Sequence, residues 1–174
     1  MGRNGRMGRR EAEHAVRKGL RSCRNVGGPR RSYVADRVCP QSPCAAEVRM
    51  IFDTDVMIWA FRGNGKALDA IDEATTRSIS SVTYMELLQG VRNKAEMLSM
   101  KRFLSTLGFA TLPVTAEIST RAISIMESTA LKSDLGVCDA LVFATALESG
   151  DTLLSGNAKH FKEVPLLDAR AFRA

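Results

Sequence analysis

This sequence of 174 residues contains no long apolar run. No run approaches the roughly 18 residues that a membrane-spanning helix needs. The Arg/Gly-rich start also lacks the hydrophobic stretch of a signal peptide. We therefore expect a soluble protein that is not secreted and has no membrane partner.

Cysteine is scarce in the larger part of the chain. Cys23, Cys39 and Cys44 precede residue 50, and only Cys138 follows it. Their spacings match neither a zinc site nor a disulfide framework. Because nothing after residue 50 depends on oxidation, the sequence favours a reducing, cytoplasmic location.

An excess of positive charge is also missing after residue 50. Residues 1–49 hold 12 Lys/Arg against 4 Asp/Glu, and residues 50–174 hold 13 against 15, so the net charge of +6 divides into +8 and −2. Binding of the larger part to a polyanion therefore cannot be inferred from overall charge. It must rest on local patches, metal ions or oligomerisation.

The same boundary separates two kinds of sequence. Residues 1–49 are rich in Gly and Arg without a sustained helical or strand period, and they cannot bury enough apolar surface to offset their ordering entropy. This basic leader is either a disordered arm that touches nucleic acid or upstream sequence joined through a mis-assigned start. We favour the second interpretation because the organised pattern begins at Met50. Residues 50–174 are long enough for one domain.

Strand-like and helix-like stretches alternate along the domain. We expect helices at 54–61, 65–74, 82–91, 95–107, 116–131 and 137–150, a turn or short helix at 157–161, and strands at 49–52, 78–81, 109–114, 151–155 and 164–168. Ser81 and Thr115 are expected helix caps, and Gly150 a left-handed helix end. This alternation predicts an α/β fold with a central parallel sheet and helices on both faces, in three layers.

Acidic side chains follow the predicted strands. Asp53 ends the first strand, Glu86 lies about a turn into the helix after the second, Asp139 lies in the first turn of the 137–150 helix, and Asn157 follows the 151–155 strand. The ligand crevice of an open parallel sheet lies beyond the carboxyl ends of its strands, so all four can face it. Clustered carboxylates normally need a hard divalent cation, because otherwise they repel one another or take up protons.

Each acid also has a purely structural explanation. Asp53 or Asp55 can cap the following helix, and Glu86 can be an ordinary solvated residue. Asp139 can stabilise the positive end of its helix.

The order of motifs resembles a known family. "IFDTDVMIWAFRG", "SISSVTYMELLQG", "LGVCDALVFATALESGDTLLSGNAKHF" and "VPLLDA" are similar to the PIN domain, and within it to the VapC toxins of bacterial type II toxin–antitoxin systems. The resemblance covers essentially all of residues 50–174 and leaves residues 1–49 uncovered.

The resemblance implies a PIN-like fold and an endoribonuclease that depends on Mg²⁺ or Mn²⁺. It makes Asp53, Glu86 and Asp139 the metal-binding acids and places Asn157 where many members carry Asp. Asp55 becomes an auxiliary ligand or supporting group. A metal ion held by carboxylates can neutralise phosphate charge and activate water for in-line attack, without a covalent intermediate. We expect Glu86 to orient or deprotonate that water and Asn157 to position water or phosphate.

The resemblance further implies an RNA substrate, a cognate antitoxin protein and a homodimer. Arg62, Arg92, Lys94, Lys159 and Lys162 are candidate RNA-binding residues, since phosphate contacts supply most sequence-independent affinity. Solvated surface charge is the alternative for each.

Four other side chains invite functional interpretations that we do not favour. We expect His160 to be a structural turn residue, and Trp59 and Phe61 to pack in the core or at a dimer seam. We expect Cys138 to be a small buried thiol.

Two rival functions remain open. A phosphatase of the haloacid-dehalogenase type also begins with a strand and D-x-D, but it requires Ser or Thr where Met57 stands. A catalytically degenerate PIN-like module would only bind RNA or protein.

Overall fold

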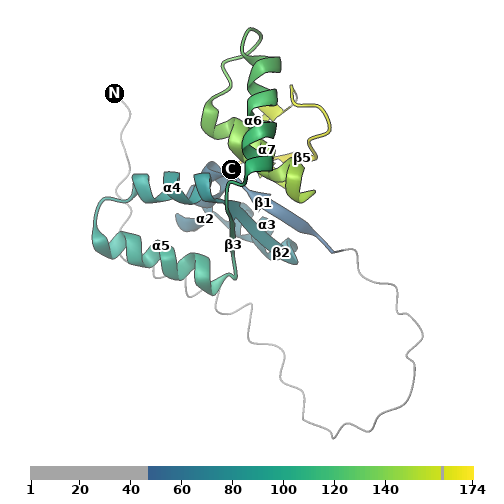
Figure 1. The fold of residues 1–174 in the computed structure, drawn as a ribbon. Helices are drawn as coiled ribbons and strands as arrows, with labels where there is room; N and C mark the ends of the chain where they lie inside the picture. The colour runs from purple at the N-terminus through teal and green to yellow at the C-terminus, as the bar shows by residue number, and fades with distance from the viewer. Residues whose placement is uncertain (1–46, 162) are drawn as a thin grey trace, which may run out of the picture.

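A central parallel sheet organises the computed structural model, which describes residues 47–161 and 163–174 (Figure 1). Its strands follow the order β3-β2-β1-β4-β5, and each pairs in parallel with its neighbours. At the centre, Ile51 lies opposite Ser78 on one side and Leu153 on the other. The strands are β1 (Arg49–Phe52), β2 (Thr76–Ser80), β3 (Ala110–Leu112), β4 (Thr152–Ser155) and β5 (Ala169–Ala171).

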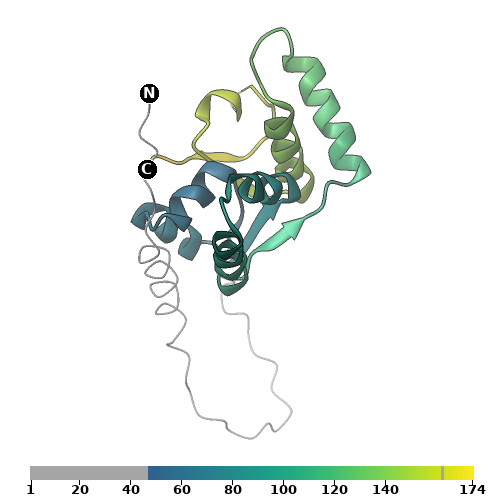
Figure 2. The same ribbon diagram turned by 90° about the vertical axis from the view of Figure 1, so that its left-hand side faces the viewer.

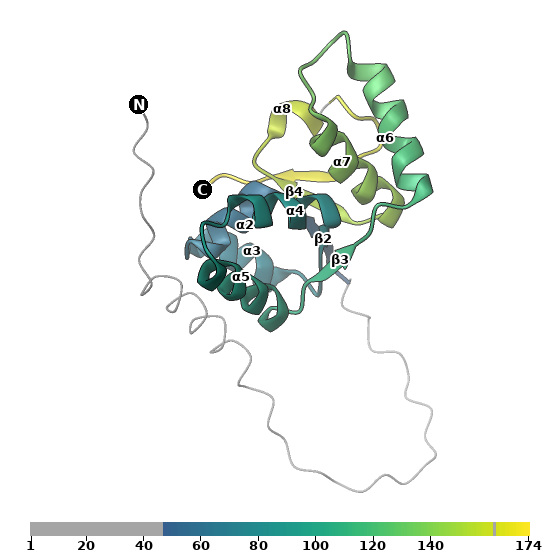
Figure 3. The ribbon, with the colours of Figure 1, turned by 60° about the vertical axis from the view of Figure 1, so that its left-hand side comes forward.

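Helices cover both faces of this sheet. Figures 2 and 3 show α2, α3 and α5 grouped on one side and α6 and α7 on the other. This arrangement confirms the predicted three-layer α/β/α fold. The helices are α2 (Thr54–Phe61), α3 (Gly65–Glu73), α4 (Ser81–Gly90), α5 (Lys94–Thr106), α6 (Ala116–Thr129), α7 (Val137–Ser149) and α8 (Ala158–Phe161).

The central strand β1 and its neighbour β4 are buried on both faces, which explains the apolar residues Met50–Phe52 and Leu153–Leu154 within them. Met50 and Phe52 of β1 belong to the core cluster formed with α2, α3 and α5. Ile51, between them, belongs to the second cluster with α6 and α7. In β4, Leu154 joins the first cluster and Leu153 the second. Successive side chains of a strand point to opposite faces, so each of these strands packs against the helices on both faces of the sheet.

Most of the expected helix ends are present. The Thr115 side chain accepts a hydrogen bond from the Ile118 backbone N–H (3.3 Å), as expected of an N-cap. Gly150 ends α7 in the left-handed conformation, with φ 66°. The predicted cap of α4, Ser81, is wrong by one residue. The side chain of Ser80, the last residue of β2, accepts the hydrogen bond from the Val82 N–H, and the helix begins at Ser81.

The predicted last strand at 164–168 is wrong. Val164 is buried, but Leu166 has a φ of 67° and is almost fully exposed, so the chain turns there instead of extending. Pairing with β4 begins only where the Asp168 carbonyl accepts from the Leu153 N–H (2.9 Å), and β5 follows at Ala169.

Phe61 packs edge-on against Phe103, with ring centroids 5.6 Å apart, as expected of a core residue. Trp59 instead remains 40% exposed on α2 and is not part of the core. No helix within residues 47–161 and 163–174 is long and apolar enough to cross a membrane.

Replacement of Gly150 by Ala should destabilise the protein by about 1–2 kcal/mol, because an L-residue in the left-handed conformation is strained. A Cβ at this position meets no atom within 4 Å, so conformation alone sets the cost. Urea unfolding followed by circular dichroism measures it.

Gly90→Ala is the matched control. Gly90 ends α4 without a left-handed φ, and a Cβ there is equally unobstructed. Alanine should therefore be neutral or stabilising by up to about 1 kcal/mol. Equal losses in both variants would contradict the assignment of the effect to the left-handed cap.

Candidate active site

The winding of the sheet reverses between β1 and β4, because the chain continues from β1 to β2 and β3 on one side and places β4 and β5 on the other. Such a reversal opens a crevice at the carboxyl ends of the two strands. Asp53 directly follows β1, and Ser155 ends β4. The Ser155 hydroxyl donates to Asp53 Oδ2 (2.6 Å), so this bond links the ends of the two strands.

Asp53 is the most buried acid of the crevice, with 8% of its surface exposed. It is the N-cap of α2, and its Oδ1 accepts from the Thr54 N–H (2.7 Å). Burial raises the pKa of this carboxyl to about 6; the hydrogen bonds from Ser155 and Thr54 oppose the shift, and the charges of Asp55 and Asp139 add to it. Asp53 therefore caps α2 and also belongs to the acidic cluster.

Glu86 reaches the same crevice from α4. Its carboxylate accepts a short hydrogen bond from the Thr54 hydroxyl. Since the Thr54 backbone N–H donates to Asp53, one threonine links two of the three acids predicted to bind metal.

Asp139 enters from the first turn of α7, whose N-cap, Gly136, provides no side-chain hydrogen bond. The positive end of the helix therefore favours its negative charge. Asp139 is close enough to raise the pKa values of both Asp53 and Asp55.

The neighbouring Cys138 is exposed, which corrects the expectation of a buried thiol. It lies at the crevice-facing start of α7, where partial desolvation, then Glu86, then Asp139 raise the pKa of the thiol. These effects place Glu86 and Asp139 beside the same side chain.

Asp55 makes two backbone contacts. Its Oδ1 accepts from the Val56 N–H (2.7 Å), and its Oδ2 accepts from the Gly156 N–H (2.8 Å), 101 residues away. Burial first, and then the charge of Asp139, raise the pKa of Asp55 despite these hydrogen bonds. Asp55 therefore belongs to the crevice and also joins its two strand ends.

Asn157 lies two residues after the end of β4, the position expected from the sequence, and is half-buried. Its backbone N–H donates to the Ser155 hydroxyl oxygen (3.0 Å). The same hydroxyl donates to Asp53, so two consecutive hydrogen bonds connect Asp53 with the backbone of Asn157.

Sequence reasoning missed three supporting residues: Thr54, Ser155 and Gly156. Thr54 and Ser155 look like ordinary polar residues at a helix start and a strand end, and only the pairing of β1 with β4 places Ser155 near Asp53. Gly156 has no left-handed φ, so conformation does not require glycine at this position. The requirement is steric, because a Cβ there would lie 2.0 Å from Asp55 Oδ2.

The acids of the crevice have only oxygen donors, which suit Mg²⁺ or Mn²⁺. No salt bridge found among the described residues includes Asp53, Asp55, Glu86 or Asp139. Within that same part of the chain, no three acidic, His or Cys side chains already form a complete metal-binding group. The donor chemistry and the lack of basic partners in this part of the chain fit a divalent cation, and Asp53, Glu86 and Asp139 are the residues that would hold it.

The candidate RNA-binding residues are scattered. Arg62 is the exposed C-cap of α2, and Lys159 is exposed in α8, directly beyond the crevice loop. Arg92 is already engaged, because its guanidinium donates twice to Glu96 (3.2 and 3.3 Å). Lys94 begins α5.

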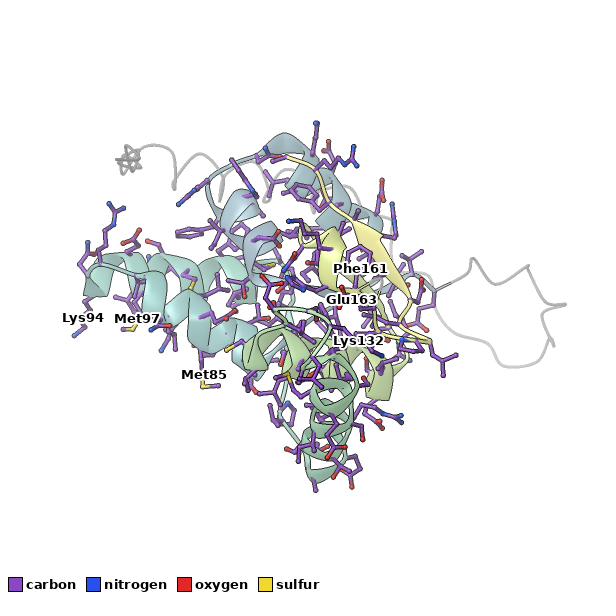
Figure 4. The ribbon with its side chains drawn as sticks, turned by 90° about the horizontal axis from the view of Figure 1, so that it is seen from above. Met85, Lys94, Met97, Lys132, Phe161 and Glu163 are labelled. Carbon is purple, nitrogen blue, oxygen red and sulfur yellow. The ribbon has the colours of Figure 1, made fainter. Side chains whose placement is uncertain are left out.

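Figure 4 shows Lys94 well separated from Phe161 at the end of α8. Lys162 lies outside the described residues. Of these basic side chains, Lys159 therefore has the best position next to the crevice.

His160 is largely enclosed in α8, with 11% of its side chain exposed, and its Nε2 lies 3.8 Å from Asp134 Oδ1. This contact joins α8 to the segment before α7, in keeping with the predicted structural role.

The profile of the PIN domain family matches residues 50–167, and the chain belongs to this family. Its fold is similar to a chain of a toxin–antitoxin complex from Klebsiella pneumoniae, with 25% identity, a TM-score of 0.61, and coverage of 70% of this chain and 96% of the other. No curated protein matches the sequence significantly.

VapBC complexes are also similar in fold. The match to VapBC2 from Rickettsia felis, bound to a promoter DNA fragment, has 19% identity, a TM-score of 0.63, and coverage of 71% and 98%. The match to DNA-bound VapBC from Salmonella typhimurium has 18% identity, a TM-score of 0.62 and the same coverages. The family resemblance seen in the sequence is confirmed.

In metal-free protein, the raised pKa of Asp53 should make stability fall as the pH rises from about 4 to about 7. The folded state holds a proton in this range that the unfolded state has released, so the group's contribution is complete below pH 3.8 and lost through pH 6. The full shift corresponds to about 3 kcal/mol. Asp53→Asn removes the titration, so its stability relative to wild type should rise by about that amount across the window.

Urea unfolding at several pH values with a chelator measures this difference. Asp69→Asn, at an exposed position of α3, is the control and should follow the wild-type curve. Parallel curves for wild type and Asp53→Asn would contradict the prediction.

Proposed function

We propose that this protein is a metal-dependent endoribonuclease and the toxin of a toxin–antitoxin pair. Its substrate is RNA, its cofactor Mg²⁺ or Mn²⁺, and its inhibitor a cognate antitoxin. The observation that carries this proposal is the set of acids around the β1–β4 crevice, which come from three separate segments and have no basic partner among the described residues.

The proposed division of labour follows the contacts. A divalent cation bound here supplies neutralisation of phosphate charge and activation of water. Asp53 and Asp139 are the principal ligands, since their charges already interact. Glu86, oriented by the Thr54 hydroxyl, directs or deprotonates the attacking water. Asn157 hydrogen-bonds water or phosphate.

RNA is polyanionic and the crevice is acidic, so the negative charge of the crevice without a metal ion would repel the substrate. A divalent cation held by Asp53, Glu86 and Asp139 would offset part of this charge, and nearby basic residues would add to the effect. This requirement supports a metal-dependent reaction over one in which the acids act alone.

The proposed partners rest on the comparisons. The Klebsiella pneumoniae structure is described as a toxin–antitoxin complex, which supports an antitoxin partner for this chain. An antitoxin that offers a basic residue to the unpaired acids would complement the crevice electrostatically. We also propose a homodimer, with the exposed Trp59 as a candidate residue of its seam.

Asp53→Ala and Asp139→Ala should each lower Mg²⁺-dependent cleavage of total cellular RNA by about 1,000-fold or more. Loss of several kcal/mol of charge stabilisation has this effect, because each 1.36 kcal/mol is a factor of ten. Single-turnover cleavage by the full chain, freed of antitoxin, measures the loss.

Asp69→Ala should cleave like wild type, because Asp69 is exposed on α3 and outside the crevice. Cleavage that persists in Asp139→Ala would sink the metal-nuclease proposal. A folded wild-type protein that binds RNA without cleaving it would instead be the degenerate binding module.

Lys159→Ala should weaken RNA binding and reduce its salt dependence by about one unit of slope, as loss of one phosphate contact does. Arg92→Ala should have a smaller effect, because Glu96 already occupies the guanidinium. Fluorescence anisotropy at several salt concentrations measures both, with Asp53→Ala as a background that prevents cleavage. Equal effects of the two substitutions would contradict the ranking.

A further inference from the structure

Asp55 and Gly156 form a close contact that capping of α2 does not explain, because the N-cap of that helix is Asp53. The Gly156 N–H donates to Asp55 Oδ2 (2.8 Å), and a Cβ at position 156 would lie 2.0 Å from that oxygen and 3.2 Å from the carboxyl carbon. Real Cβ atoms do not approach so closely. Any side chain at 156 must therefore push the Asp55 carboxylate out of its position.

The backbone conformation does not explain the glycine. The positive φ values among the described glycines belong to Gly63, Gly108 and Gly150, so Gly156 adopts a φ open to other residues. The Asp55 carboxylate cannot simply rotate aside, because its other oxygen accepts from the Val56 N–H (2.7 Å). Rotation would break both hydrogen bonds.

The contact spans the crevice. Asp55 lies in the first turn of α2, after β1, whereas Gly156 lies in the loop after β4 and directly precedes Asn157. The loop is held at two adjacent residues by two acids that lie two positions apart: Ser155 by Asp53 (2.6 Å), and Gly156 by Asp55. Without the second contact, the bonds left to Gly156 and Asn157 are local ones, such as those from the Ala158 N–H to the Gly156 carbonyl (3.0 Å) and from the Asn157 N–H to the Ser155 hydroxyl (3.0 Å).

We propose that Asp55 is a positioning residue that acts through Gly156: it fixes the loop that presents Asn157 to the crevice, and it does so as a hydrogen-bond acceptor and not as a metal ligand. The expected effect on metal binding rests on the proposed metal-dependent function, but the contact between Asp55 and the loop can be tested independently of that function. Gly156 thereby has a role in the site that neither its conformation nor its chemistry suggests.

Two substitutions separate the acceptor from the charge. Asp55→Ala removes both, whereas Asp55→Asn keeps one oxygen that can accept from Gly156 while losing the charge and the contact with Val56. Gly156→Ala should reproduce Asp55→Ala, because its Cβ displaces the carboxylate. Gly65→Ala is the control, since a Cβ there meets no atom within 4 Å.

The first measurement is amide hydrogen exchange of the full chain with a chelator present. The amide of residue 156 should exchange about 10-fold faster or more in Asp55→Ala and Gly156→Ala, and near the wild-type rate in Asp55→Asn and Gly65→Ala. Exchange in α5, which carries none of the crevice residues, reports whether the fold as a whole has loosened. Wild-type protection of residue 156 in Asp55→Ala would overturn the proposal.

The second measurement is the affinity for Mn²⁺ alone, by electron paramagnetic resonance. Loss of a residue that orients a metal site typically costs about 10–100-fold in affinity, which we expect for Asp55→Ala and Gly156→Ala. Asp55→Asn should stay within about 3-fold of wild type. Equal losses in Asp55→Asn and Asp55→Ala, with residue 156 still protected in Asp55→Asn, would make Asp55 a ligand and overturn the proposal.

The double variant Asp55→Ala/Gly156→Ala tests the link directly. Once the carboxylate is gone, the nearest remaining atom to the new Cβ is the Phe172 carbonyl oxygen at 3.7 Å, an ordinary contact. The double variant should thus bind Mn²⁺ no more weakly than either single variant, whereas independent effects would multiply. Absence of Mn²⁺ binding by wild type would refute the proposed function, and hydrogen exchange would still decide the role of Asp55 in the loop.

Discussion

The burial of Asp53 at the carboxyl end of β1 is the constraint around which the crevice is organised. A buried carboxylate is costly unless it is hydrogen-bonded or paired. Ser155 and Thr54 satisfy its two oxygens, yet the pKa stays raised to about 6 because burial and two acidic neighbours outweigh these bonds. The fold therefore holds a destabilised negative charge at its switch point, and such a local conflict is typical of a functional site.

The rest of the structure makes this conflict tolerable. β1 and β4 are packed on both faces by the two core clusters, so the ends of the strands cannot move apart to let water in around Asp53. Except for Glu86, which lies in the second turn of α4, the crevice residues lie in loops or at helix starts, where backbone N–H groups are free to donate. A rigid sheet with polar turns at one edge thus supplies both the burial and the hydrogen bonds that the acids need.

The sequence was sufficient for the features that depend on local pattern. The apolar runs of β1 and β4, the Thr115 cap and the Gly150 helix end follow from residue type and spacing, and so does the position of Asp53 after a strand. It was insufficient where apolarity had two explanations: residues 164–168 are as apolar as a strand, but Leu166 turns the chain. Contacts over long separations, such as Gly156 with Asp55, leave no local signal at all.

Under the proposed function, protons and metal ions compete for the same carboxylate. Asp53 is acidic enough to be ionised at neutral pH, but its pKa of about 6 means that protonation begins to exclude a cation as soon as the pH falls toward that value. A bound cation would offset the repulsion from Asp55 and Asp139, which adds to the larger effect of burial in raising this pKa. The acids that destabilise one another in the metal-free protein would then be the groups that hold the cation. Their mutual repulsion and their binding capacity have one physical origin.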